Sequence, residues 1–317
     1  MRVLITGGFG FVGGRLAHHL HEAGHTVLLG ARQAKTSPVW LPQAQVVQTQ
    51  WQDAPALERV CQSVDVVVHA AGMNAQDCAA DPLSALEING VATARLVEAA
   101  RQAGVRKFLY LSTAHVYASP MAGVITEDTC PRNLHPYATS HLAGENALLH
   151  AASTSKLEGI VLRLSNAFGA PMHRDVNCWT LLVNDLCRQA VTARRLTLRS
   201  NGGQHRDFIA MAEVTRVIGW MIENSGQAQG GVSNSIYNVG SGRSKTLLEM
   251  TQLIQTRCHQ VLGFQPQFQP TEKHEHPSIK YKNQHLDRID WQVRQDPVAE
   301  IDQLLLYCNQ HFRNAEE

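Results

Sequence analysis

The first half of the chain alternates short apolar runs with longer segments in which apolar residues recur every three or four positions. The short runs have the length of β-strands, and the longer segments have the period of amphipathic helices. Such alternation predicts an α/β fold in which helices cover both faces of a parallel sheet. The expected strands are Val3–Thr6, Thr26–Leu29, Val46–Gln48, Asp65–His69, Lys107–Ser112 and Gly159–Leu164. The expected helices are Phe11–Ala23, Pro55–Cys61, Leu83–Ala103 and Pro136–Ala152.

The pattern is less regular after Asn166. The elements expected here are a helix at Cys178–Thr192, a strand at Leu196–Arg199, a helix from Glu213, a strand at Ser235–Val239, a helix from Thr246 and an exposed loop at Gln265–Pro277. No serine-, proline- or charge-rich linker separates this half from the first. We therefore predict a main domain over residues 1–169, with return segments near 205–242. A smaller, interleaved C-terminal α/β lobe would comprise residues 170–204 and 245–317.

Charge and composition exclude several classes of protein. The 317 residues include 28 basic and 27 acidic side chains, so the net charge of +1 gives no general attraction for nucleic acid or an anionic membrane. No run approaches the roughly 18 apolar residues of a membrane span, and the N-terminus lacks the features of a signal peptide. The seven cysteines are odd in number and form no C-x-x-C pair, which favours reduced thiols in a cytoplasmic protein. The 16 histidines show no metal-ligand spacing, so we expect no metal site.

Three glycines follow the first strand. Gly7, Gly10 and Gly13 lie where this strand passes into a helix, so the backbone can approach a pyrophosphate and offer it N–H groups. This context predicts a Rossmann-like, doubly wound parallel sheet that binds a dinucleotide. The second strand runs into Arg32 with no carboxylate for the ribose hydroxyls, and arginine is a suitable donor to a 2′-phosphate. We expect NADP(H) rather than NAD(H), unless Arg32 is only a solvated cation or stacks on adenine.

A second motif lies further along the chain. The stretch LSTAHVYA, which contains Thr113, precedes Tyr137-Ala-Thr-Ser-His141. Together with the start MRVLITGGFGFVG, these segments resemble the extended short-chain dehydrogenase/reductase family, the NAD-dependent epimerases and dehydratases that modify nucleotide-sugars. The resemblance covers essentially the whole chain and is firmest over residues 1–170. Position 141 departs from it, because this chain has Tyr-x-x-x-His where the family has Tyr-x-x-x-Lys.

The resemblance implies a role for particular residues. Tyr137 would be the catalytic acid/base, Thr113 would bind the same substrate oxygen, and His141 would stand in the place of the lysine. Asn89 would have an architectural role, and we expect His69 to be buried and hydrogen-bonded. Together with Arg32, the implied cofactor contacts are Gly7, Gly10, Phe11, Val12, Gly13, Ala70, Ala71, Tyr137 and His141. The implied substrate contacts are Thr113, Asn166, Asn177, Lys280 and, for the diphosphate, Arg206.

The histidine at position 141 leaves three readings open. Tyrosine titrates near pH 10, so a tyrosine base at pH 7 needs about three pH units of electrostatic help. His141 lies one helical turn after Tyr137 and on the same face. It either supplies positive charge, with activity rising in mildly acidic conditions, or contacts the ribose passively while the oxidised nicotinamide activates Tyr137. In the third reading, hydride chemistry is lost.

These residues predict an NAD(P)-dependent epimerase or 4-keto-reductase of nucleotide-diphosphate sugars. Dehydration is not expected, because Ala114 and His115 stand where family dehydratases have an Asp-Glu pair. His115 is either a substrate contact or a structural residue. The alternative function is a catalytically weak or inactive dinucleotide-binding sensor or scaffold. The resemblance also implies a homodimer that packs through the helices near 83–103 and 136–152.

Overall fold

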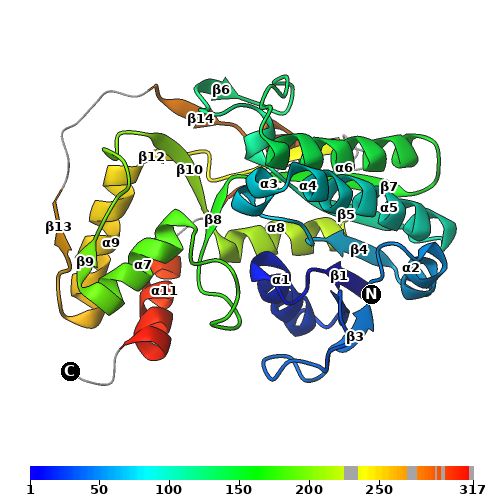
Figure 1. Cartoon of the computed structure of the whole chain (residues 1–317), viewed down its shortest axis with the longest axis horizontal. Helices are drawn as coiled ribbons and strands as arrows, with labels where there is room; N and C mark the ends of the chain where they lie inside the picture. Colours follow the sequence, from blue (N-terminus) through cyan, green and yellow to red (C-terminus); the bar gives the residue numbers. More distant parts are fainter. Residues whose placement is uncertain (225–234, 270–276, 290, 294–296, 314–317) are drawn as a thin grey trace.

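The computed structural model describes residues 1–224, 235–269, 277–289, 291–293 and 297–313. Its main element is a parallel seven-stranded sheet with the order β11-β7-β5-β4-β1-β2-β3, which confirms the predicted fold class (Figure 1). The order reverses between β1 and β4, and doubly wound folds bind ligands at such a reversal. The strands are β1 (Arg2–Thr6), β2 (Thr26–Ala31), β3 (Gln45–Gln48), β4 (Val66–His69), β5 (Lys107–Thr113), β7 (Glu158–Leu164) and β11 (Ser235–Val239).

Helices cover both faces of the sheet, because successive side chains of a strand point to opposite faces. Val3 and Ile5 of β1 belong to a core formed with α1 and α8. Leu4, between them, belongs to a second core formed with α2, α5 and α6. The helices are α1 (Phe11–Glu22), α2 (Ala54–Cys61), α5 (Ala92–Gln102), α6 (Pro136–Ser153) and α8 (Met211–Glu223).

The segment before β5 is less regular than predicted. Sequence periodicity predicts one helix over Leu83–Ala103. The structure has α3 (Ala75–Ala80), α4 (Pro82–Ala85), a π-helical turn at Leu86–Val91 and then α5. Within the π-helical turn, the Asn89 carbonyl accepts hydrogen bonds from Thr93 Oγ1 at 2.7 Å and from the Tyr110 hydroxyl at 3.4 Å. Irregular turns of this kind often occur beside functional sites.

The C-terminal lobe has a core of its own between α7, α9 and α11. Strand β8 leads the chain from the sheet domain into this lobe, and β10, which pairs with β8 in parallel, leads it back to α8. The lobe is therefore interleaved with the sheet domain (Figure 1). Its helices are α7 (Leu182–Ala193), α9 (Leu247–Leu262), α10 (Gln284–Arg288) and α11 (Pro297–Phe312). The short strands are β6 (Gly123–Ile125), β8 (Asn166–Phe168), β9 (Arg195–Leu196), β10 (His205–Ala210), β12 (Ser244–Thr246), β13 (Gln267–Phe268) and β14 (Ile279–Tyr281).

Several boundaries in the lobe differ from those predicted. Helix α7 begins at Leu182, four residues later than expected, because the preceding residues form a turn closed by the Leu181 N–H. Strand β9 ends at Leu196, three residues earlier than predicted. The next N–H, that of Thr197, donates to Gln189 Oε1 and not to the backbone of a neighbouring strand. The stretch expected to be a loop contains β13, and its residues 270–276 lie outside the described residues.

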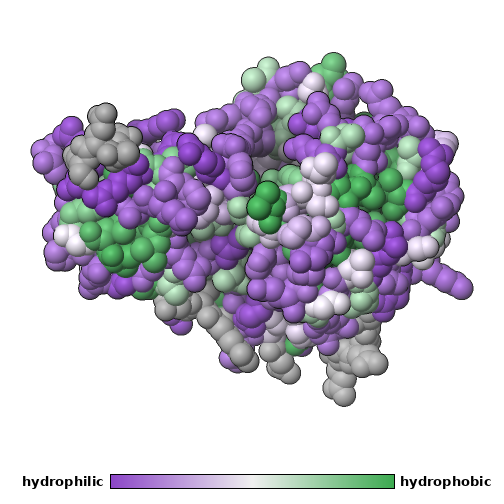
Figure 2. All heavy atoms as spheres, turned by 90° about the horizontal axis from the view of Figure 1, so that it is seen from below, coloured by the Kyte–Doolittle hydropathy of each residue, from purple (hydrophilic) through white to green (hydrophobic). Residues whose placement is uncertain are grey.

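The surface seen from below is mostly hydrophilic, and its hydrophobic residues gather in patches, one of them over the C-terminal lobe (Figure 2). None of the helices within the described ranges is long and apolar enough to cross a bilayer. The seven cysteines all lie in described segments and are free thiols. Six of them are buried, and Cys130 is exposed.

Candidate active site

The glycine loop lies at the carboxyl end of β1. Gly7 has a φ of +68°, and the Gly10 N–H donates to its carbonyl at 2.8 Å. A Cβ on Gly13 would lie 2.3 Å from the Gly7 carbonyl oxygen, and one on Gly7 would lie 2.8 Å from the backbone of Ala70 and Ala71. Larger residues would therefore push the loop away from β4. The loop ends at the N-terminus of α1, where no side chain caps the N–H groups.

Thr113 and Tyr137 meet at the carboxyl end of β5. The Thr113 hydroxyl lies near enough to the Tyr137 phenol to affect its pKa. Tyr137 is the second residue of α6, and its N–H donates to the His135 ring at 3.2 Å. Burial raises the pKa of Tyr137, and the nearby Thr113 hydroxyl opposes that rise. The neighbouring Ser112 donates to the buried Glu145 carboxylate instead, so Thr113 is the hydroxyl available to the site.

His141 lies one turn further along α6 and is buried. Its ring centroid is 4.6 Å from that of Tyr137, in an edge-to-face arrangement. Its Nδ1 is 2.8 Å from the Tyr110 hydroxyl. Burial, assisted by the nearby His115, lowers the pKa of His141 to about 4. A histidine with this pKa is neutral at pH 7, so in this arrangement it supplies no positive charge to Tyr137.

Asn89 and His69 hold the framework behind these residues. Asn89 Oδ1 accepts from the Met73 N–H at 2.8 Å, and its Nδ2 donates to Ser140 Oγ of α6 at 3.1 Å. Asn89 thus ties the turn after β4 to the helix that carries Tyr137. His69 is hydrogen-bonded through both ring nitrogens, and burial lowers its pKa to about 3. The expected buried, hydrogen-bonded His69 is confirmed.

Arg206 of β10 stands without a partner among the described residues. Its neighbour Asp207 is buried and accepts from Ser165 Oγ at 2.7 Å and from the Ser241 N–H at 2.7 Å. Burial lowers the pKa of Arg206. Surrounding protein atoms partly remove water from the His115 ring and lower its pKa, although the side chain keeps an exposed surface, and the nearby charge of Arg206 adds to that effect.

His115 lies near both Arg206 and Tyr137. It is solvent-exposed, and its ring centroid is 6.2 Å from that of Tyr137. Its backbone is fixed by hydrogen bonds to Thr113 Oγ1 and from Asn133 Nδ2, whereas its ring bonds to no described residue. A phenol, a hydroxyl, an imidazole and an unpaired guanidinium thus border one site.

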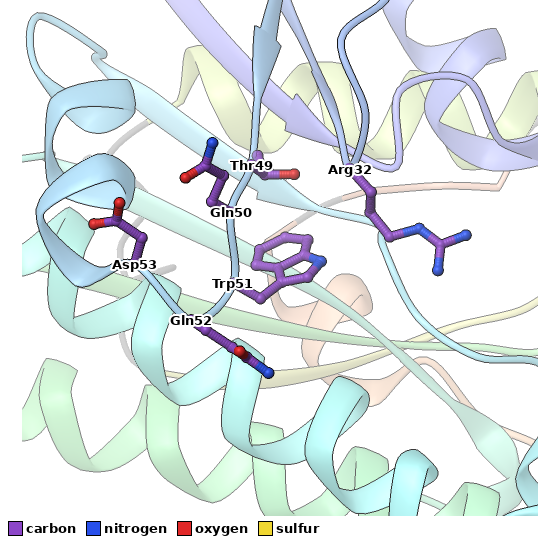
Figure 3. Close-up of a pocket in the computed structure, with 6 residues that line it drawn as sticks. All are labelled: Arg32, Thr49, Gln50, Trp51, Gln52 and Asp53. Carbon is purple, nitrogen blue, oxygen red and sulfur yellow. The ribbon is translucent and has the colours of Figure 1, made fainter.

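A pocket of about 450 Å³ lies at the carboxyl ends of β2 and β3 and is lined by Arg32 and residues 49–53 (Figure 3). Arg32 and Asp53 lie on opposite sides of Trp51. The Asp53 carboxylate accepts from the Ala56 N–H at 2.9 Å and so caps α2. Arg32 is exposed, and its guanidinium has no carboxylate partner in the described part of the chain.

Comparison with known proteins agrees with this geometry. The sequence profile described as the NAD dependent epimerase/dehydratase family matches residues 3–240. The chain belongs to this family. It is thus an enzyme of the extended short-chain dehydrogenase/reductase type, as the sequence motifs indicated.

The relatives and solved structures extend over most of the chain. UDP-glucose 4-epimerase of Azospirillum brasilense is 28% identical over 275 residues, which cover 80% of this chain and 76% of that protein. The dTDP-6-deoxy-L-talose 4-dehydrogenase (NAD(P)(+)) of Kitasatospora kifunensis is 27% identical over 266 residues, which cover 80% of this chain and 78% of that protein. The structure of Thermus thermophilus UDP-glucose 4-epimerase in complex with NAD covers 98% of this chain and 100% of its own, with a TM-score of 0.79 and 23% identity.

For three further residues that the family motifs suggested as substrate contacts, the structure describes no contact with Thr113 or Tyr137. Asn166 of β8 donates to the Asp207 carbonyl at 2.8 Å. Asn177 is exposed in the segment before α7, and Lys280 is exposed on β14. No described contact joins Asn177 or Lys280 to Arg206.

Two features of the candidate active site were not predicted from the sequence. The loop of residues 49–53 was not expected to line the pocket, although its place after the third strand is a usable signal. Tyr110 was expected only as part of a strand, and no sequence pattern shows that its hydroxyl reaches His141.

Proposed function

We propose that the enzyme epimerises or reduces a nucleotide-diphosphate sugar at C4, with Tyr137 as the acid/base. The observation that carries this is the Thr113–Tyr137 pair next to the unpaired Arg206. A phenol and a hydroxyl suit proton transfer to one sugar oxygen, and a guanidinium suits a diphosphate. The relatives named as UDP-glucose 4-epimerases make UDP-glucose the first substrate to test.

The dinucleotide would lie on the glycine loop. Gly7 and Gly13 leave a cradle that a Cβ would fill, and the uncapped N-terminus of α1, which begins with Phe11 and Val12, suits a pyrophosphate. Bound there beside Ala70 and Ala71, the nicotinamide would accept or return the hydride and, when oxidised, bring positive charge. The residues of the glycine loop and the turn after β4 therefore fit a dinucleotide cofactor.

Tyr137 would hold and transfer the proton. Because burial raises its pKa, the phenol is protonated at neutral pH and is ready to protonate a ketone oxygen. The neutral His141 does not lower that pKa, so deprotonating a sugar hydroxyl requires the charge of the oxidised cofactor. Of the three readings of His141, this geometry favours the ribose contact without charge.

For the choice of cofactor we propose NADP(H). The exposed Arg32 borders a pocket in which Asp53 is occupied by capping α2, so a 2′-phosphate would meet a free cation. Such a preference favours 4-keto-reduction, whereas tightly held NAD would favour epimerisation. The relative named as an NAD(P)(+) dehydrogenase is compatible with either cofactor.

We assign residues 1–169 with the return segments near 205–242 to the dinucleotide part. Residues 170–204 and 245–317 would form the substrate part, with Asn166, Asn177 and Lys280 as further substrate contacts. We also propose that the enzyme is a cytoplasmic homodimer.

Mass spectrometry of the purified protein, before and after incubation with UDP-glucose and other nucleotide-sugars, tests the proposal. Retained NAD with an isomeric product would mean epimerisation, and a product changed by two mass units with exchangeable NADPH would mean reduction or oxidation. Arg206→Met should weaken binding of the nucleotide-sugar by about tenfold or more, because a charge-assisted contact is lost. Arg243→Met, an exposed cation on the turn before β12, is the matched control. Bound cofactor without turnover would support the sensor or scaffold function instead.

A further inference from the structure

Tyr110 lies directly behind His141 and has little freedom to move. It belongs to β5 and is 1% exposed. Its ring stacks between His69 and His141, with centroid distances of 5.5 Å and 5.8 Å. The hydroxyl reaches under α6 at Gly144, where a Cβ would approach it to 2.8 Å. Only glycine at this position leaves room for the contact between the hydroxyl and His141.

The surrounding hydrogen bonds indicate where the Tyr110 proton points. Its nearest acceptor is His141 Nδ1 at 2.8 Å, and the Asn89 carbonyl is further away at 3.4 Å. That carbonyl already accepts from Thr93 Oγ1 at 2.7 Å, and Thr93 also bonds to His69. Burial raises the pKa of Tyr110 well above its usual range, so the hydroxyl keeps its proton. This arrangement favours Tyr110 as the donor toward His141 Nδ1.

We propose that Tyr110 is a positioning residue that holds His141 as the neutral tautomer protonated on Nε2. When Nδ1 accepts, the single ring proton of a neutral imidazole must be on Nε2. The Cε1 atom, which lies between the two ring nitrogens, faces the turn after β4, since a Cβ on Gly72 would lie 3.8 Å from it. Ala70 and Ala71 of that turn pack against the glycine loop.

The consequence for the site rests on the proposed function. The Nε2–H of His141 becomes a fixed, uncharged donor at the edge where the cofactor would bind. Its acceptor would be an oxygen, such as a ribose hydroxyl. The substitution of lysine by histidine thus keeps a hydrogen-bond donor and removes its charge.

NMR of the protein without cofactor tests the tautomer directly. With ¹⁵N-labelled histidine, long-range proton–nitrogen spectra should show His141 protonated on Nε2 alone at pH 7, with the signals assigned by His141→Gln. Tyr110→Phe should produce a mixture of both tautomers. Tyr117→Phe is the matched control, because its buried hydroxyl donates to Asn238 and not to His141. A proton on Nδ1 in the unsubstituted protein, or an unchanged tautomer in Tyr110→Phe, would overturn the inference.

Dinucleotide affinity gives a second readout. Tyr110→Phe should weaken binding by about fivefold, the effect of one net hydrogen bond, and should have no effect in a His141→Gln background. An equal loss in both backgrounds would also contradict the inference. If the unsubstituted protein bound no dinucleotide, the proposed function would fail, while the NMR result would still decide the tautomer.

Discussion

At the scale of single residues, burial decides the charge of the active-site histidine. His141 stands on the same helix face as Tyr137, which the spacing in the sequence predicts. Its charge depends on the loss of water around its ring and on His115, which the fold brings close to it. The neutral state follows from these surroundings and disfavours the reading in which His141 supplies positive charge.

The two buried histidines should make the protein less stable in acid. Burial lowers the pKa of His141 to about 4 and that of His69 to about 3, below the ordinary value near 6.5. Since the unfolded state binds these protons first, stability is fully present above pH 6.5 and falls as the pH decreases toward 4. Each histidine contributes a slope of about 1.4 kcal/mol per pH unit within this window.

Urea unfolding measured from pH 7.5 to 5 tests this dependence. His141→Gln should flatten the curve by the slope of one histidine. His150→Gln, an exposed histidine on the same helix, should leave it unchanged. An unaltered pH dependence in His141→Gln would show that this histidine is protonated in the native state as readily as in the unfolded one.

The cofactor preference also belongs to a single residue. We expect NADPH to bind at least about tenfold more tightly than NADH, because Arg32 offers a charge-assisted contact to the 2′-phosphate. Arg32→Asp should remove or reverse that preference in fluorescence titrations. Arg59→Asp makes the same charge change on the exposed face of α2 and should preserve the ratio. Equal affinities in the unsubstituted enzyme would leave Arg32 as a solvated cation.

At the scale of elements, local signals set some boundaries and distant contacts set others. Helix α9 starts at Leu247, directly after Thr246, whose hydroxyl forms with Glu249 a capping box that can be read in the sequence. The π-helical turn has no such local signal, and one of its carbonyls, that of Asn89, accepts a hydrogen bond from Tyr110 of strand β5. The presence of a helix in each of these segments was therefore predictable from the sequence, and the π-helical turn was not.

The outer face of the segment from α4 to α5 predicts an interface. Leu83 of α4 and Leu86 and Val91 of the π-helical turn are 69%, 47% and 42% exposed, and exposed large apolar side chains along one segment commonly mark a contact between proteins. We expect a dimer through this segment. The double variant Leu83→Glu/Leu86→Glu should be monomeric by light scattering after gel filtration. Leu306→Glu, which alters a 51% exposed leucine on α11, should stay dimeric. Dimers in both variants would place the interface elsewhere.

At the scale of the whole molecule, a buried ion pair fastens the lobe to the sheet domain. Arg15 of α1 donates to Glu300 Oε1 of α11 at 2.9 Å and to the Ala170 carbonyl at 2.8 Å. The other carboxylate oxygen of Glu300 accepts from the Ala212 N–H at 3.0 Å. Three segments that are remote in sequence thus meet at one carboxylate, so the two parts should unfold together.

Removal of that carboxylate charge should destabilise the whole protein. We expect Glu300→Gln to lower the free energy of unfolding by about 3 kcal/mol, because Arg15 loses its partner in a mostly buried site. Asp302→Asn, on the same helix, breaks a more exposed pair with Arg257 and should cost less than about 1 kcal/mol. Urea unfolding followed by tryptophan fluorescence and circular dichroism should give coincident transitions. Separate transitions would mean that the lobe folds independently.

The sequence by itself determined the sheet, the glycine loop and the pairing of a hydroxyl with Tyr137. The sheet and the glycine loop rest on local periodicity and a short motif, whereas the pairing of Thr113 with Tyr137 was implied by the resemblance to the family. Only the tertiary structure decided that His141 is neutral, that Arg206 has no partner among the described residues and that Tyr110 reaches under Gly144. The physical reason is that charge state and pairing depend on burial and on neighbours from distant segments, which spacing along the chain does not specify.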